Sequence, residues 1–84
     1  MHFHWLRWRA DPDEVKPGES FRRCGETRVA EIATVLGLRH DLLGIPHVLF
    51  TIAFECSDSN RFEEGARTLA LNSFLDAYRE RVVS

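Results

Sequence analysis

The stretch that most constrains the fold is residues 47–55, HVLFTIAFE, where apolar side chains alternate along the chain. An alternation with a period of two is typical of a β-strand, whose successive side chains point to opposite faces. β-branched and aromatic residues dominate the stretch, and they fit a pleated surface. The sequence therefore predicts a central strand here. The face that we expect in the core is formed by Val48, Phe50, Ile52 and Phe54.

A second apolar stretch, residues 27–36, fits two kinds of secondary structure. As a helix, it places apolar side chains at i, i+3, i+4 and i+7, with a capping residue before them and a glycine after them. As a strand, it alternates less cleanly, so periodicity alone slightly favours the helix. The strand would pair antiparallel with residues 47–55 through a connection over residues 37–45, in which Asp41 and Gly44 are turn residues.

The helical interpretation would make TRVAEIATVLGL the first helix and turn of a helix-turn-helix DNA-binding unit. The recognition helix would then be residues 39–43, and Gly44 with Pro46 ends it after about one and a half turns. A helix that short cannot fill a major groove. We therefore predict the extended hairpin and keep the helix-turn-helix regulator as the weakest alternative.

The composition indicates one small globular domain over residues 1–84. The chain has 84 residues, of which 44% are hydrophobic, and a formal net charge of −2. These values are ordinary for a single soluble domain. The chain contains no run of 18 apolar residues, and its N-terminus lacks the apolar stretch of a signal peptide. We expect no membrane partner, a cytoplasmic location, and reduced thiols at Cys24 and Cys56.

The remaining segments predict short strands, turns and a C-terminal helix. Residues 2–9 indicate an aromatic-rich strand whose apolar phase changes midway. The helix is expected to begin with Ser73 as its N-cap. Its inward face is formed by Phe74, Ala77, Tyr78 and Val82. The other expected segments are an exposed loop over 10–19, a strand over 20–24 with Phe21 inward, a polar turn over 57–65 and a strand over 67–71.

This order of segments predicts a mostly β fold, a small and strongly bent antiparallel sheet with one C-terminal helix, closed far enough to protect its edges. The segments GIPHVLF, EGARTLAL and FLDAY resemble those of short uncharacterised bacterial domains with an SH3-like small barrel. The resemblance covers about residues 21–78. It implies an SH3-like, partly open barrel, and it implies no particular activity because such families commonly lack an assigned one.

The sequence shows no complete set of catalytic or metal-binding residues. Its histidines and cysteines form no C-x-x-C or H-x-x-x-H pair, and it holds no nucleophile motif and no glycine-rich phosphate loop. We therefore expect no metal site, no cofactor and no enzyme activity. The side chains considered as metal ligands are His2, His4, His40, His47, Cys24 and Cys56.

Aromatic rings and arginines gather in the first third of the chain, a combination that proteins use to bind single-stranded nucleic acid. The candidate nucleic-acid-binding residues are Trp5, Arg7, Trp8, Arg9, Arg22, Arg23 and Arg28, with Phe21 beside them. The alternative is that the rings form core and the arginines protect an edge strand. Residues 1–30 hold six basic and five acidic residues, a small excess for a nucleic-acid surface.

Together these patterns predict a non-enzymatic small-barrel interaction module that binds a partner protein. The alternative is a module that binds single-stranded RNA or DNA through its aromatic and arginine side chains. The identity of the partner, the oligomeric state and the pathway do not follow from the sequence.

Overall fold

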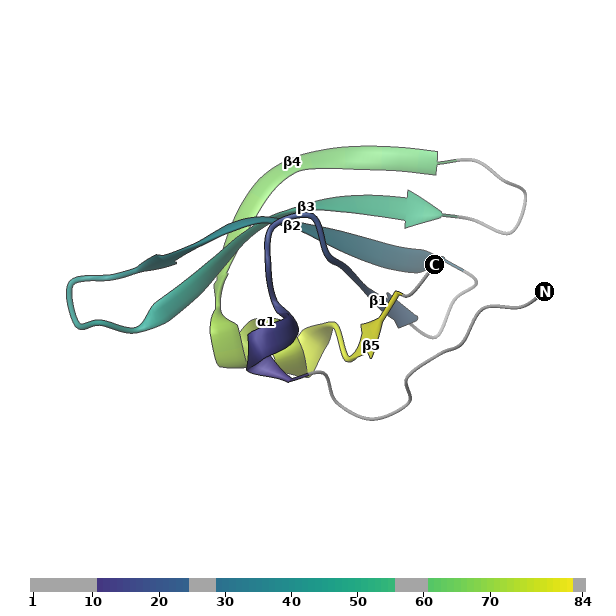
Figure 1. Cartoon of the computed structure of the whole chain (residues 1–84). Coiled ribbons are helices and arrows are strands. Elements are labelled where there is room, and N and C mark those ends of the chain that lie inside the picture. The colour runs from purple at the N-terminus through teal and green to yellow at the C-terminus, as the bar shows by residue number, and fades with distance from the viewer. Residues whose placement is uncertain (1–10, 25–28, 56–60, 83–84) are drawn as a thin grey trace.

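The computed structural model describes residues 11–24, 29–55 and 61–82 and shows one antiparallel sheet with a C-terminal helix (Figure 1). Its elements are η1 (Pro12–Glu14), β1 (Ser20–Cys24), β2 (Ala30–His40), β3 (Pro46–Glu55), β4 (Arg61–Ala70), α1 (Leu71–Ala77) and β5 (Glu80–Arg81). The strand order is β4-β3-β2-β1-β5. A meander of four strands is thus followed by α1 and by a short strand that returns to β1. The predicted mostly β class is confirmed, but β4 and β5 remain the two edges, and the described strands do not close into a barrel.

The ambiguous stretch is extended, as predicted, for the residues that the structure describes. Ala33 pairs with Ile52 and Val35 pairs with Phe50, so β2 and β3 form the expected antiparallel hairpin. The helical interpretation is wrong, and with it the helix on which a helix-turn-helix unit would depend. The reason is that helix and strand propensities of such a short pattern differ little, whereas a neighbouring strand supplies a full ladder of hydrogen bonds.

The connection between β2 and β3 is shorter than residues 37–45, because both strands extend into it and leave only residues 41–45. Asp41 and Gly44 are its turn residues, as predicted. The Asp41 carboxylate accepts hydrogen bonds from the backbone N–H groups of Leu43 (2.8 Å) and Ile45 (2.9 Å). Gly44 has φ +79°, a conformation that favours glycine.

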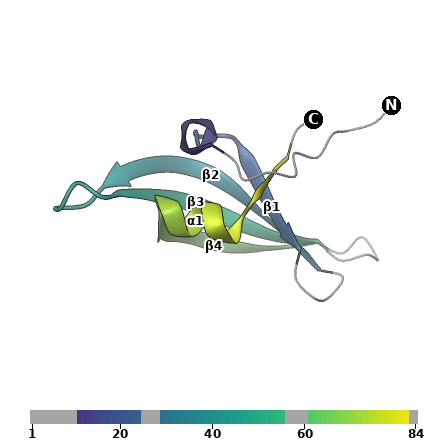
Figure 2. The same cartoon turned by 90° about the horizontal axis from the view of Figure 1, so that it is seen from below.

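The predicted face of β3 lies in the core. Val48, Phe50 and Ile52 are at most 2% exposed, and Phe54 is partly buried against them. Figure 2 shows α1 lying over one face of the sheet, across β3 and β4. The buried core cluster consists of Val15, Phe21, Ala33, Val35, Val48, Phe50, Ile52, Phe74, Leu75 and Tyr78.

The C-terminal helix begins earlier than predicted. Because β4 runs directly into α1, the N-cap is Ala70 and not Ser73, and no side chain caps the first turn. The helix ends at Ala77, so Val82 lies beyond it. Phe74 and Tyr78 do point into the core, which confirms the central part of the predicted inward face.

Two loop predictions need correction. Residues 61–65 belong to β4 and not to a turn, because an edge strand tolerates charged residues as a turn does. In the expected loop over 10–19, Pro12–Glu14 form a 3-10 turn, and Val15 is only 1% exposed and joins the core.

The predicted strand over residues 2–9 lies outside the described residues. No helix in the part of the chain that the structure describes is long and apolar enough to cross a membrane.

Replacing Phe50 by alanine is expected to destabilise the fold by about 3–5 kcal/mol, because it removes a buried ring and leaves a cavity. Thr51→Ala, on the opposite face of β3, should cost about 1 kcal/mol or less. Urea unfolding followed by circular dichroism measures both. If Leu49→Ala collapsed while Phe50→Ala unfolded like the parent, the faces of β3 would be inverted.

The Asp41 turn should depend on pH. Backbone hydrogen bonding, chiefly from Ile45, lowers the pKa of Asp41. The charged carboxylate therefore supports the turn at any pH above the ordinary aspartate pKa of about 3.9. This support is lost as the pH falls through the lowered pKa of Asp41 in the folded protein. We expect the amide resonances of Leu43 and Ile45 to shift below about pH 4. Asp41→Ala should give the shifted resonances at neutral pH, whereas Asp41→Asn keeps an oxygen acceptor and should retain the parent pattern.

Candidate functional site

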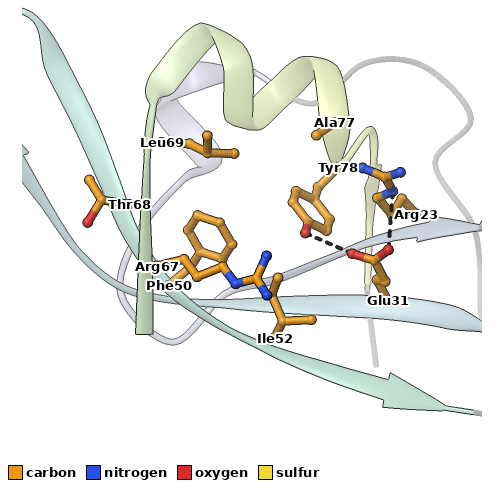
Figure 3. A pocket seen from close by; sticks show the side chains of 9 residues that line it. All are labelled: Arg23, Glu31, Phe50, Ile52, Arg67, Thr68, Leu69, Ala77 and Tyr78. Atoms are coloured by element: carbon orange, nitrogen blue, oxygen red, sulfur yellow. Dashed lines mark hydrogen bonds and ion pairs between the residues drawn. The ribbon is translucent and has the colours of Figure 1, made fainter. Parts of the chain in front are cut away.

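A cavity of about 300 Å³ lies between the sheet and the C-terminal end of α1 (Figure 3). Apolar side chains from β3 and β4 form its floor, and polar side chains from β1, β2, β4 and the residue after α1 surround its mouth. The lining residues are Arg23, Glu31, Phe50, Ile52, Arg67, Thr68, Leu69, Ala77 and Tyr78. The combination of an apolar floor with a few polar groups is typical of small ligand sites.

The strand register brings most of these side chains to one face. Arg23 of β1 lies directly opposite Glu31 of β2, and Phe50 of β3 lies opposite Arg67 of β4. Directly paired residues of antiparallel strands point to the same side of the sheet. Each arginine is therefore placed on the core side of the sheet, at the edge of the apolar floor.

A change of register in β4 decides which of its residues face the cavity. Phe50 pairs with Arg67 but Ile52 pairs with Glu64, so β4 has one extra residue between these pairs. If the present sequence paired regularly from Glu64 onwards, without the bulge, Arg67 would lie opposite Leu49 and on the other face of the sheet. Bulges of this kind commonly redirect a side chain beside a functional site.

Tyr78 follows the last helical residue and joins the core to the cavity. Its ring packs against Phe50 (centroids 5.7 Å apart) and Phe74 (5.2 Å), and its hydroxyl donates a hydrogen bond to Oε1 of Glu31 (3.1 Å). Burial raises the pKa of Tyr78 to about 12, and the hydrogen bond to Glu31 acts in the same direction. The phenol is therefore neutral at physiological pH and acts as a fixed hydrogen-bond donor.

Glu31 and Arg23 complete a small polar cluster. The Glu31 carboxylate accepts from Tyr78 and pairs through Oε2 with Nε of Arg23 at 3.7 Å. The Arg23 guanidinium carbon lies 5.8 Å from the centroid of the Tyr78 ring. A partly exposed ion pair adds little stability, so the main effect of these contacts is to fix the orientation of the three side chains at the mouth of the cavity.

The described lining of the cavity offers several groups suited to recognition. Its described lining includes two guanidinium groups, one carboxylate, one neutral phenol and one hydroxyl, and none of the lining side chains is a histidine or a cysteine. An arginine fork recognises carboxylate or phosphate groups geometrically. This arrangement can bind an apolar group together with an anionic one.

The structure brings together two of the seven predicted nucleic-acid-binding residues. Arg22 and Arg23 line a shallower depression of about 220 Å³, next to the cavity, together with Ala77, Arg79 and Glu80. Arg22 pairs there with Glu80 at 3.5 Å. Phe21 is fully buried in the core and presents no ring to a base. The other predicted residues, Trp5, Arg7, Trp8, Arg9 and Arg28, lie outside the described residues.

Sequence reasoning did not single out Glu31, Arg67 or Tyr78. Glu31 carried a signal, since it is an acidic residue in an apolar strand and in phase with the core residues Ala33 and Val35. Tyr78 was expected on the inward helix face, but its hydroxyl partner is 47 residues away in the chain. Arg67 had no signal because its face depends on the extra residue in β4.

The described candidate metal ligands do not form a cluster. Nδ1 of His47 lies 3.0 Å from the carbonyl oxygen of Ile45, and His40 is exposed on the same hairpin. No group of three histidine, cysteine or acidic side chains that could hold a metal ion occurs within residues 11–24, 29–55 and 61–82. His2, His4 and Cys56 lie outside these ranges.

Comparison with family models, with curated proteins and with solved structures gives no match to this chain. The site is therefore interpreted from its own geometry.

Tyr78 is the only tyrosine of the chain, so its ionisation can be followed by ultraviolet absorbance. We expect a midpoint near pH 12 in the folded protein and near pH 10 in the unfolded protein. Because folding raises this pKa, the associated stability is complete below about pH 10 and is lost as the pH rises towards 12. Glu31→Gln should lower the midpoint. A folded protein that titrates near pH 10 would contradict the Tyr78–Glu31 contact.

Proposed function

We propose that this chain is a non-enzymatic interaction module of the SH3-like small-barrel kind, and that its cavity binds a short acidic segment of a partner protein. The observation that carries the proposal is the placement of Arg23 and Arg67 at the mouth of a cavity floored by Phe50, Ile52 and Leu69. An apolar side chain of the partner would occupy the floor, and a neighbouring carboxylate would meet the guanidinium groups.

The size of the cavity supports recognition of one anchoring side chain. About 300 Å³ is at the lower end of the range for small-molecule sites. Binding energy at protein interfaces is often concentrated in one or two anchors that fill such pockets. The segment on either side of the anchor would then lie along the mouth of the cavity.

The charges around the cavity support an anionic partner. The single lining carboxylate, Glu31, already accepts from Tyr78 and pairs with Arg23. Arg67 on β4 is exposed, and Arg79 is exposed at the adjoining depression. Charged groups at the rim of an interface act mainly on orientation and on the rate of association. The partner should therefore be selected by its acidic residues and held by its apolar anchor.

The curvature of the sheet also supports a binding role. Figure 1 shows β4 curving towards α1, while β5 returns to pair with β1. A bent sheet of this kind leaves a concave face against which the cavity forms. The lining of the cavity, two arginines around an apolar floor, favours binding. A cytoplasmic location is part of the same proposal.

Single-stranded nucleic acid is the second candidate, because Arg22, Arg23 and Arg79 line one depression. Proteins of this class stack bases on exposed aromatic rings. Among the described residues near these arginines, the rings of Phe21 and Tyr78 are buried. The described surface therefore supports an acidic polypeptide better than a nucleic acid.

The proposal is tested by nuclear magnetic resonance titration of the ¹⁵N-labelled chain with a peptide of alternating glutamate and leucine. We expect saturable shifts at the amides of the cavity residues, with a Kd below about 1 mM. Ala77→Phe places a ring in the cavity mouth and should weaken binding tenfold or more. The matched control is Ser73→Phe, at an exposed position of the same helix, and it should bind like the parent.

Two further ligands make the titration decisive. A matched lysine–leucine peptide should not bind, and equal affinity for both peptides would contradict charge recognition. An oligothymidine of about 12 nucleotides spans the binding site of a typical single-strand-binding domain. Binding of this oligonucleotide without binding of the acidic peptide would overturn the proposal in favour of the nucleic-acid function.

A further inference from the structure

The β2–β3 hairpin projects beyond the rest of the fold, on the left in Figure 1. We call residues 39–46 the outer arm. The tip of the outer arm carries Leu42, which is fully exposed, and Leu43, which is 84% exposed, and Ile45 behind them is 45% exposed. Contiguous apolar residues on the surface of a small domain usually mark a contact with another molecule.

The outer arm is held in one conformation. Asp41 binds the amides of Leu43 and Ile45 through its carboxylate, its own N–H donates to the carbonyl of Ile45 (3.0 Å), and the N–H of Gly44 donates to the carbonyl of Asp41 (2.9 Å). These bonds fix the loop that carries the two leucines. A preorganised apolar tip loses little conformational entropy when it docks.

A hollow lies at the root of the same arm. It has a volume of about 70 Å³ and is lined by Ile45, Pro46, Ala70, Leu71 and Asn72, where β3 begins and β4 passes into α1. None of these residues lines the larger cavity. His47 pairs with Ala70 and Ile45 lines the hollow, so the turn that carries Leu43 lies beyond the hollow along the hairpin.

We propose that the occupant of the outer arm is a second copy of this chain. In a two-fold dimer the arms lie side by side and antiparallel, and the Leu42–Leu43 tip of each copy sits at the hollow of the other. A two-fold interface requires that one surface patch hold both the projecting part and its receptor. The outer arm meets this requirement, because the tip and the hollow belong to one continuous apolar patch.

The charges of the patch permit this contact. Residues 42–46 and 70–72 contain no charged side chain. The Asp41 carboxylate at the tip is occupied by amides of its own turn. Arg39 and His40, at the base of the outer arm, are exposed and would remain in water at the rim of the contact. Docking the two arms therefore buries apolar groups without isolating a charge in the interface, which would be costly.

The size of the patch predicts a weak dimer. The arm and the hollow together comprise 11 residues per copy, residues 39–46 and 70–72. A standard interface uses about 20–30 residues on each side for about 800 Å², so this contact would bury about half of that area. Such interfaces are transient, and we expect a dimer that dissociates in the micromolar to millimolar range.

Sedimentation equilibrium over a concentration series up to about 1 mM tests the proposal directly. The weight-average mass of the parent chain should rise above the monomer mass as the concentration increases. The double variant Leu42→Ser with Leu43→Ser should remain monomeric and keep the parent melting temperature, because both side chains are exposed. Leu36→Ser, at an exposed leucine outside the outer arm, is the matched control and should still dimerise.

A complementation experiment tests the pairing of tip with hollow. Leu43→Glu and Asn72→Arg should each give monomers. In a symmetric dimer, either change would bury an unpaired charge in both of the two equivalent contacts. An equal mixture of the two variants should recover dimers, since one contact then joins glutamate to arginine and the other is native. Three results would overturn the proposal. The parent chain could be monomeric, the dimer could survive the double serine change, or the mixture of folded variants could stay monomeric. Binding of the parent, but not of the double serine variant, to phosphatidylcholine vesicles without dimerisation would assign the arm to a lipid surface and also overturn it.

Discussion

The contact on which the rest of the structure depends is that of the Phe74 ring with two strands of the sheet. Phe74 lies edge-on to Phe21 of β1 (centroids 5.5 Å apart, 84° between the ring planes) and to Phe50 of β3 (5.0 Å, 61°). Because β2 separates these two strands, one helical side chain fixes the curvature of three strands at once. Edge-to-face packing of aromatic rings also has a preferred geometry, which sets the position of α1 on the sheet.

The cavity is a consequence of where that helix is held and where it ends. α1 contains only seven residues, so the sheet is covered near Phe74 and remains open beyond Ala77. Tyr78 lies at this boundary, with its ring in the core and its hydroxyl directed to Glu31. The same packing that stabilises the fold thus orients the polar groups of the candidate site, and the arginines of β1 and β4 complete its mouth.

The parts of the structure that depend on local pattern could be predicted, and those that depend on register could not. The alternation around Phe50 correctly identified a strand with a buried face, β3, although the middle strand of the sheet is β2. Residues 27–36 were ambiguous because their apolar spacing suits both a helix and a strand, and only pairing with β3 decides between them. The cavity could not be predicted, because it combines residues from β1, β2, β3, β4 and the end of α1, and because the face of Arg67 is set by one extra residue in β4.

That extra residue is accommodated locally, within β4. It lies in an edge strand, and β1, β2 and β3 carry most of the buried core. Removal of Gly65 or Ala66 would restore a regular ladder in which Arg67 still lies opposite Phe50 and Glu64 still lies opposite Ile52. The bulge is therefore a place where β4 tolerates a one-residue change of length during molecular evolution, while the side chains that face the cavity and the aromatic core keep their positions.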